Sequence, residues 1–194
     1  MSVLQPDSEE YYAQLGKFVH NFSHVEALFY TFIRCMFDEN TEAMHSLLSK
    51  SSLCNVIDAI KETFSDIKTP ESSRIMEACA HMNLISKSRN IILHNPPTLG
   101  ANDLYCVDIF SGQSVKSSKS ARINPADLKE MQADLEKICA IFSFYMSERF
   151  GGPEIGEDNS GYPDYLKLLE RAFSSPWQYT RKTYQHHQAH ESRD

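Results

Sequence analysis

Apolar side chains recur at steps of three and four residues along most of this chain, which is the pattern of helices with one face in a core. The longest stripe covers residues 9–37. It comprises Leu15, Phe18, Val19, Phe22, Val25, Phe29, Phe32, Ile33 and Met36. Further stripes cover residues 52–65, a stretch from residue 69 to about residue 94, and a stretch from residue 124 to about residue 150. The pattern predicts an amphipathic helix over each of these ranges.

Residues that start or stop helices mark the bounds of these ranges. Thr41 can cap one further short helix, and Pro70 suits the first turn of the helix that starts near residue 69. Pro96 stops that helix, because proline disfavours helical conformation in the residue before it. Asn124 has the position of an N-cap for the last long helix, which Gly151 ends.

Two stretches lack the helical period. An alternating run followed by a Ser-Gly-Gln turn predicts a small β-hairpin around residues 103–123. Residues 151–163 are rich in Gly, Pro, Asp and Asn, as linkers are, and a short helix and a polar tail follow, which Trp177 could pin to the body. We therefore predict an all-α bundle of about five main helices with a small β-hairpin insertion. Residues 1–150 would form the bundle, and residues 151–194 the linker, short helix and C-terminal tail.

The composition is typical of a soluble globular protein, with 41% hydrophobic and 23% charged residues. No apolar run reaches the roughly 18 residues of a membrane helix, and the first residues lack the apolar core of a signal peptide. We therefore expect a cytoplasmic protein without a membrane segment. The five cysteines are widely spaced and contain no Cys-x-x-Cys pair, so we expect reduced thiols and neither disulfides nor a zinc finger.

The formal net charge of −7 argues against a protein that coats nucleic acid without specificity. The charge is unevenly placed, however. Residues 81–125 hold five basic and two acidic residues, and five minus two leaves a local excess of three positive charges. The basic residues are Lys87, Arg89, Lys116, Lys119 and Arg122. This stretch is either an RNA-facing patch or an ordinary solvated surface.

Arg89, Asn90 and His94 stand near the C-terminal end of the helix predicted over residues 69–94. An Arg and a His suit phosphodiester chemistry, because guanidinium can hold a phosphate and imidazole can transfer a proton near neutral pH. Arg89 also falls within the apolar stripe, where a charged side chain must be paired or must line a cleft or an interface. Two explanations stay open. Arg89 either serves catalysis or pairs with Glu26 in the core, with His94 as a helix-end cation.

The Arg-x4-His spacing is a weak signal by itself. It recurs between Arg181 and His186 in the predicted tail, where no amphipathic helix surrounds it, and we treat that copy as chance. His20 and His24 are four residues apart on one predicted helix, a spacing that can bind zinc, but no third ligand is evident. We predict no metal site and no bound cofactor.

The run Arg89-Asn90-x-x-x-His94 at the end of a long helix resembles the signature of the HEPN superfamily, and the order of helices over roughly residues 9–150 resembles its bundle. HEPN proteins are typically metal-independent endoribonucleases of defence systems and toxin–antitoxin pairs, with active sites where two copies meet. The resemblance implies a homodimer in which Arg89 stabilises the scissile phosphate, Asn90 orients the catalytic groups and His94 transfers a proton. The attacking group would be the 2′-hydroxyl of the RNA substrate.

Pro96, two residues after His94, departs from one HEPN subgroup. Toxins paired with nucleotidyltransferase antitoxins usually carry a tyrosine at that position. The sequence therefore disfavours this subgroup and leaves room for another neutralising antitoxin or defence-system partner. Two alternative functions remain, namely a non-catalytic helical module for dimerisation or interaction, and a nucleotide-binding domain.

Overall fold

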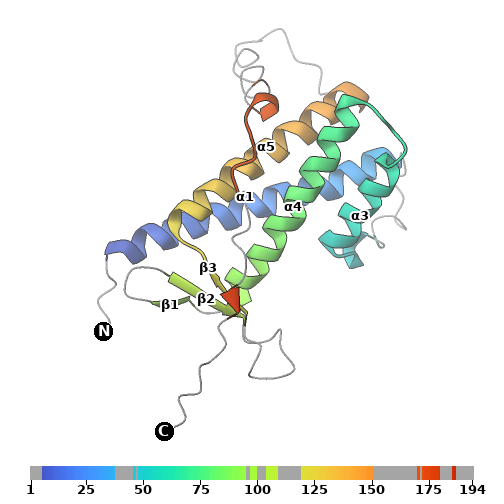
Figure 1. Ribbon diagram of the computed structural model, residues 1–194. Coiled ribbons are helices and arrows are strands. Elements are labelled where there is room, and N and C mark those ends of the chain that lie inside the picture. The colour runs from blue at the N-terminus through green and yellow to red at the C-terminus, as the bar shows by residue number, and fades with distance from the viewer. Residues whose placement is uncertain are drawn as a thin grey trace.

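The computed structural model describes residues 6–37, 46, 48–94, 97–99, 104–108, 119–150, 170, 172–179 and 185–186, with side chains described from residue 9 onward and outside the strands. The long helices are α1 (Pro6–Met36), α3 (Leu53–Phe64), α4 (Pro70–His94) and α5 (Pro125–Phe150) (Figure 1). The fold is mainly helical, and the four predicted helical ranges agree closely with these bounds. Thr41, predicted to cap a short helix, lies outside the described residues.

Helices α1 and α5 lie side by side and run in the same direction (Figure 1). Near their N-terminal ends, Lys129 Nζ donates a hydrogen bond of 2.8 Å to Glu10 Oε1. Further along, the rings of Phe29 and Phe142 pack with their centroids 4.4 Å apart, and the ring of Phe32 lies 4.8 Å from that of Phe142. All three phenylalanines are fully buried, so this pair of helices forms the centre of the core.

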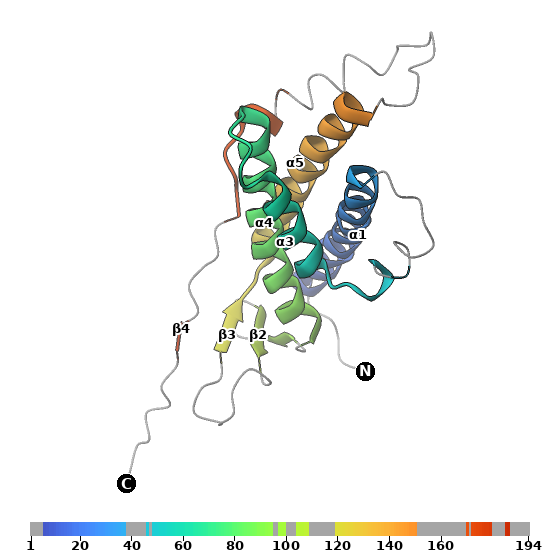
Figure 2. The same ribbon diagram turned by 90° about the vertical axis from the view of Figure 1, so that its right-hand side faces the viewer.

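Helix α3 covers the end of the bundle opposite the N-terminus of α1 (Figure 2). Ser52 caps it, because its side chain accepts a hydrogen bond from the backbone N–H of Asn55 at 3.3 Å. Its buried face comprises Leu53, Val56, Ile57, Ile60 and Phe64. The hydroxyl of Tyr30 donates to the carbonyl oxygen of Ser51 at 2.8 Å and so ties the start of α3 to α1.

Helix α4 crosses the α1–α5 pair and runs antiparallel to α5 (Figure 1). Its buried residues include Ile75, Ala78, Cys79, Met82 and Ile85, as the apolar stripe predicts. The apolar pattern over residues 69–94 places Leu93 on the same stripe, but its side chain is 41% exposed. The prediction was wrong because Leu93 is rotated about 80° from Ile85 on the helical wheel, whereas Ile92 is rotated only about 20° and is buried.

A small antiparallel sheet lies beyond the C-terminal end of α4 (Figure 2). Its strands are β1 (Pro97–Leu99), β2 (Leu104–Asp108), β3 (Lys119–Arg122) and β4 (Gln185–His186), in the order β1-β2-β3-β4. The range predicted for a hairpin contains β2 and β3, which pair with Cys106 opposite Ala121. β4 comes from the C-terminal tail, for which the sequence predicts no strand.

Four cysteines have described side chains, namely Cys35, Cys54, Cys79 and Cys139, and all four are free thiols. Burial raises the pKa of Cys79 to about 12, which keeps this thiol protonated and unreactive. None of the described helices is both long enough and apolar enough to cross a membrane.

Candidate functional site

Arg89 lies in the last two turns of α4 and is half-buried against α1. Its Cζ atom is 5.3 Å from the centroid of the Phe22 ring, which is itself buried. On the same guanidinium, Nη1 donates a hydrogen bond of 3.1 Å to Asn90 Oδ1. An aromatic ring of a neighbouring helix and an amide of its own helix thus hold the guanidinium.

Arg89 forms no ion pair with any carboxylate among the described residues, Glu26 included. The alternative in which Arg89 pairs with Glu26 in the core is therefore wrong for this structure. Arg89 instead contacts the ring of Phe22, which lies one turn before Glu26 on α1. The positive charge of Arg89 is not neutralised by a described side chain and can still attract an anion.

Asn90 and His94 are exposed and lie one helical turn apart on α4. Leu93, beside His94, adds an exposed apolar side chain to the same end of the helix. The structure therefore brings Arg89 and Asn90 together through a hydrogen bond and places His94 at the helix terminus. No contact joins His94 to Arg89 among those that the described residues make.

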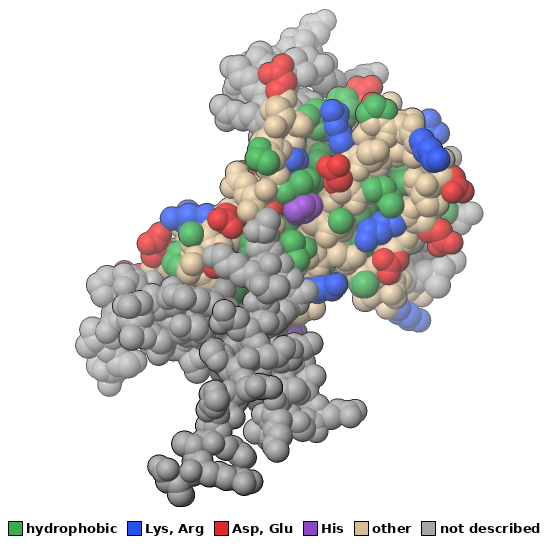
Figure 3. All heavy atoms as spheres, viewed as in Figure 1, with side chains coloured by type: hydrophobic (Ala, Val, Ile, Leu, Met, Phe, Trp, Pro, Cys, Tyr) green, Lys and Arg blue, Asp and Glu red, His purple; other side chains and the backbone are tan. Residues whose placement is uncertain are grey.

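The predicted basic stretch is only partly described. Lys87 is exposed and Arg89 is half-buried, whereas Lys116 lies outside the described residues. The side chains of Lys119 and Arg122, in β3, are likewise outside the description. Over the described part of the face in Figure 3, Lys and Arg side chains are interspersed with Asp and Glu side chains. A basic surface around α4 therefore remains a prediction.

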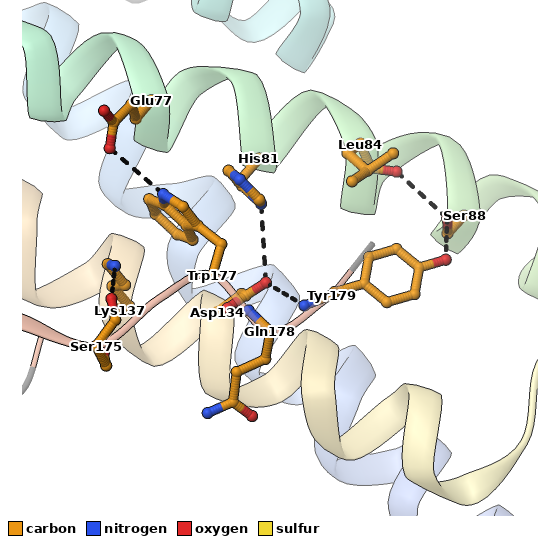
Figure 4. Close-up of polar contacts among 10 residues, drawn as sticks. All are labelled: Glu77, His81, Leu84, Ser88, Asp134, Lys137, Ser175, Trp177, Gln178 and Tyr179. Atoms are coloured by element: carbon orange, nitrogen blue, oxygen red, sulfur yellow. Dashed lines mark hydrogen bonds and ion pairs between the residues drawn. The ribbon is translucent and has the colours of Figure 1, made fainter. Parts of the chain in front are cut away.

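A second polar cluster, which the sequence does not predict, lies between α4, α5 and residues 172–179 (Figure 4). Asp134 of α5 is 1% exposed. Its Oδ1 accepts a hydrogen bond of 2.9 Å from the backbone N–H of Gln178, and its Oδ2 accepts one of 2.8 Å from that of Tyr179. A single buried carboxylate thus satisfies two consecutive peptide groups, which offsets the cost of burying its charge.

Trp177 packs into the same cluster (Figure 4). Its ring stacks on the imidazole of His81, with centroids 4.0 Å apart and planes 11° apart. Lys137 Nζ lies 4.2 Å from the centroid of the indole and also donates to the carbonyl oxygen of Ser175. The indole Nε1–H donates to Glu77 Oε2 at 3.4 Å. The predicted role of Trp177 in pinning the tail agrees with these contacts.

Tyr179, the last residue described in this segment, lies directly beside the Arg89 motif. The hydroxyls of Tyr179 and Ser88 are 2.9 Å apart, and both residues are buried. Ser88 precedes Arg89 on α4. We name the receiving surface the α4–α5 docking surface. It is made of Arg74, Glu77, His81 and Ser88 of α4 with Asp134 and Lys137 of α5.

The imidazole of His81 carries a buried Nδ1 that has no hydrogen-bond partner among the described groups and lies 3.8 Å from Asp134 Oδ2. Burial lowers the pKa of His81. Lys137 acts in the same direction, while the Asp134 and Glu77 carboxylates oppose it. Docking of residues 172–179 therefore favours the neutral form of the His81 imidazole.

This lowered pKa predicts that the protein loses stability in mild acid. The unfolded imidazole, with a pKa of about 6.5, binds its proton at a higher pH than folded His81 does. The stabilising contribution is therefore present above that value and is lost as the pH falls through the lower pKa of the folded state. Urea unfolding should give a smaller free energy at about pH 5.5 than at about pH 7.5. His81→Gln should reduce this difference, whereas His24→Gln, at an exposed position, should leave it unchanged.

Metal ligands do not converge among the described residues, since no three His, Cys, Asp or Glu side chains there form a group that could hold an ion. His20 and His24 are both exposed on α1. His24 borders a pocket of about 250 Å³ between α1 and α5, whose lining also includes Val25, Leu135 and Ser143. The second Arg-x4-His copy, Arg181 to His186, has no described side chains.

Comparisons with known proteins give no match for this chain among protein families, curated proteins or solved structures.

Proposed function

We propose that this chain is a metal-independent endoribonuclease of the HEPN type, built on a HEPN-like helical bundle and acting in the cytoplasm as a homodimer. The observation that carries the proposal is the state of Arg89. Its guanidinium is held by Phe22 and Asn90, no described carboxylate neutralises it, and exposed His94 lies one turn beyond Asn90. A fixed cation and an exposed imidazole near the same end of one helix suit a phosphodiester.

The proposed reaction uses no group beyond the RNA and these side chains. The 2′-oxygen of a ribose forms a bond to the adjacent phosphorus, and the bond from phosphorus to the 5′-oxygen of the next nucleotide breaks. A proton leaves the 2′-hydroxyl and another reaches the departing 5′-oxygen, and His94 of each copy serves one of these transfers. Arg89 stabilises the charge that develops on the phosphate oxygens, while Asn90 holds the guanidinium in place.

The homodimer has support at the same end of α4. Leu93 is 41% exposed next to His94, and burying an apolar side chain against a second copy is favourable. Two such helix ends facing each other would bring two His94 side chains to one phosphate. An antitoxin or another defence-system protein could cover the same apolar side chain to keep the nuclease silent.

The proposal is tested by incubating the purified chain with mixed-sequence RNA in excess EDTA. We expect cleavage to continue, with fragments that end in a 2′,3′-cyclic phosphate and begin with a 5′-hydroxyl. Products with 5′-phosphates, or cleavage that EDTA stops, would point to metal-dependent chemistry instead. The absence of any cleavage would favour the second candidate.

That second candidate is a non-catalytic helical interaction or nucleotide-binding module with the same fold. It is favoured by the contact of Arg89 with Phe22, since the guanidinium packs on the core there as a structural side chain would. The formal net charge of −7 also suits a protein that binds other proteins rather than nucleic acid.

A further inference from the structure

The α4–α5 docking surface recognises the main chain of residues 172–179. Asp134 accepts hydrogen bonds from two consecutive backbone N–H groups, those of Gln178 and Tyr179. Lys137 donates to the backbone carbonyl oxygen of Ser175. Side chains that bind peptide groups are a common means of holding a peptide ligand, because every peptide presents these groups.

Aromatic side chains supply the selectivity. The ring of Phe173 lies 4.2 Å from Arg74 Cζ, and its centroid is 5.5 Å from that of Phe144. Trp177 lies under Lys137 and against His81, as described above. Two rings four residues apart, each covered by a cation, define a site for a peptide with the spacing Phe-x-x-x-Trp.

Nothing in these contacts requires the segment to come from the same chain. Residues 151–169 separate the end of α5 from Glu170, which is 19 residues (169 − 150 = 19). A chain of that length spans at most roughly 65 Å, more than the diameter of a small domain. The connection through residues 151–169 is therefore long enough for residues 172–179 to reach the docking surface of a neighbouring copy. Exchange of an identical element between two copies forms a dimer with the same contacts as in the single chain, so it requires little additional free energy.

We propose that the α4–α5 docking surface is a peptide-binding site and that two copies of this chain exchange residues 172–179 through it. In the structure, the chain fills its own site with residues 172–179. The proposal is independent of RNA cleavage, since it concerns Asp134, His81 and Lys137 and not Arg89 or His94. Its consequence is a dimer whose subunits each hold the other's segment beside Ser88, the residue that precedes the Arg89 motif.

The single tryptophan of the chain, Trp177, reports on the segment directly. One full-length variant, Asp134→Ala, keeps an intact segment but has a defective docking surface. The other, Trp177→Ala with Tyr179→Ala, keeps an intact docking surface but has a defective segment and no tryptophan. When the second is titrated into the first, the emission of Trp177 should move to shorter wavelengths, and light scattering should show a species of twice the mass.

The matched control adds Asp134→Ala to the tryptophan-free variant. We expect this control to bind the segment about a hundredfold more weakly, because two charge-assisted hydrogen bonds are lost. If both variants are folded by circular dichroism and the emission of Trp177 stays unchanged even in an excess of the tryptophan-free variant, exchange between copies is ruled out.

A synthetic peptide of residues 170–180 allows a second measurement, which needs only the tryptophan-free variant with the intact docking surface. The peptide should bind the tryptophan-free variant and shift its own indole emission, whereas a peptide with Trp177→Ala should not compete with it. If the variant with Trp177→Ala and Tyr179→Ala does not fold, the variant Trp177→Phe replaces it. Trp177→Phe also lacks tryptophan, and it keeps an aromatic ring at the position of the indole. If the peptide does not bind a folded tryptophan-free variant, the docking surface is not a peptide-binding site.

Discussion

Asp134→Ala is expected to release residues 172–179 from the helices and to weaken their docking by about 3 kcal/mol or more. The substitution removes both acceptors of the backbone N–H groups of Gln178 and Tyr179. Each hydrogen bond to a charged group contributes about 1.5–3 kcal/mol, and unsatisfied buried donors add to the loss. Trp177 then leaves the contact with His81 and enters water. Its fluorescence emission should therefore be red-shifted already without denaturant.

Two signals separate local release from global unfolding. The helical circular dichroism should persist in Asp134→Ala, because α1, α3, α4 and α5 share a core that Asp134 does not fill. Glu136→Ala is the matched control, since it removes an exposed carboxylate from the same helix and should change stability by no more than about 0.5 kcal/mol. Wild-type tryptophan emission in Asp134→Ala would contradict the assignment of Asp134 as the anchor of the segment.

The helices could be predicted from the sequence because their causes are local. The apolar period marks each buried face, and Pro70 and Asn124 mark two of the starts. Leu93 shows where this reasoning fails. Leu93 is rotated about 80° from Ile85, whereas Ile92 in the same turn is buried, so the pattern alone does not assign a residue at the margin of a stripe to the core.

The docking surface could not be predicted, although the sequence holds a sign of it. Asp134 occupies a position of the apolar stripe on α5, three residues after Met131 and four before Ile138. A carboxylate there must have buried partners. Its partners are backbone groups 44 and 45 residues later, and no local pattern identifies them.

The contact partner of Arg89 also depends on the tertiary structure. Phe22 and Glu26 lie four residues apart on α1, and the sequence alone could not tell which of the two Arg89 contacts. The crossing of the two helices places the guanidinium over the ring of Phe22 and not beside the carboxylate. The sequence could therefore name the two outcomes without choosing between them.

Loss of RNA cleavage in His94→Ala, with the melting temperature nearly unchanged, is the expected result that bears most on function. Removing a proton-transferring group lowers a rate by about 10²- to 10⁴-fold. His94 is exposed at the end of α4, so the fold should not depend on it. His20→Ala is the control, because it removes an exposed imidazole from α1 and leaves the Arg89 motif of α4 intact.

Arg89 distinguishes catalysis from a structural role through two substitutions. Arg89→Lys keeps a cation but loses the planar guanidinium that can hold a phosphate through two parallel hydrogen bonds, so cleavage should fall by about a hundredfold or more. Arg89→Ala should abolish cleavage and destabilise the protein by only about 1 kcal/mol, the contribution of its contact with Phe22. If Arg89→Ala instead unfolds the chain, and the wild-type protein cuts no RNA, then Arg89 holds α4 against α1 and the helical interaction module is the correct function.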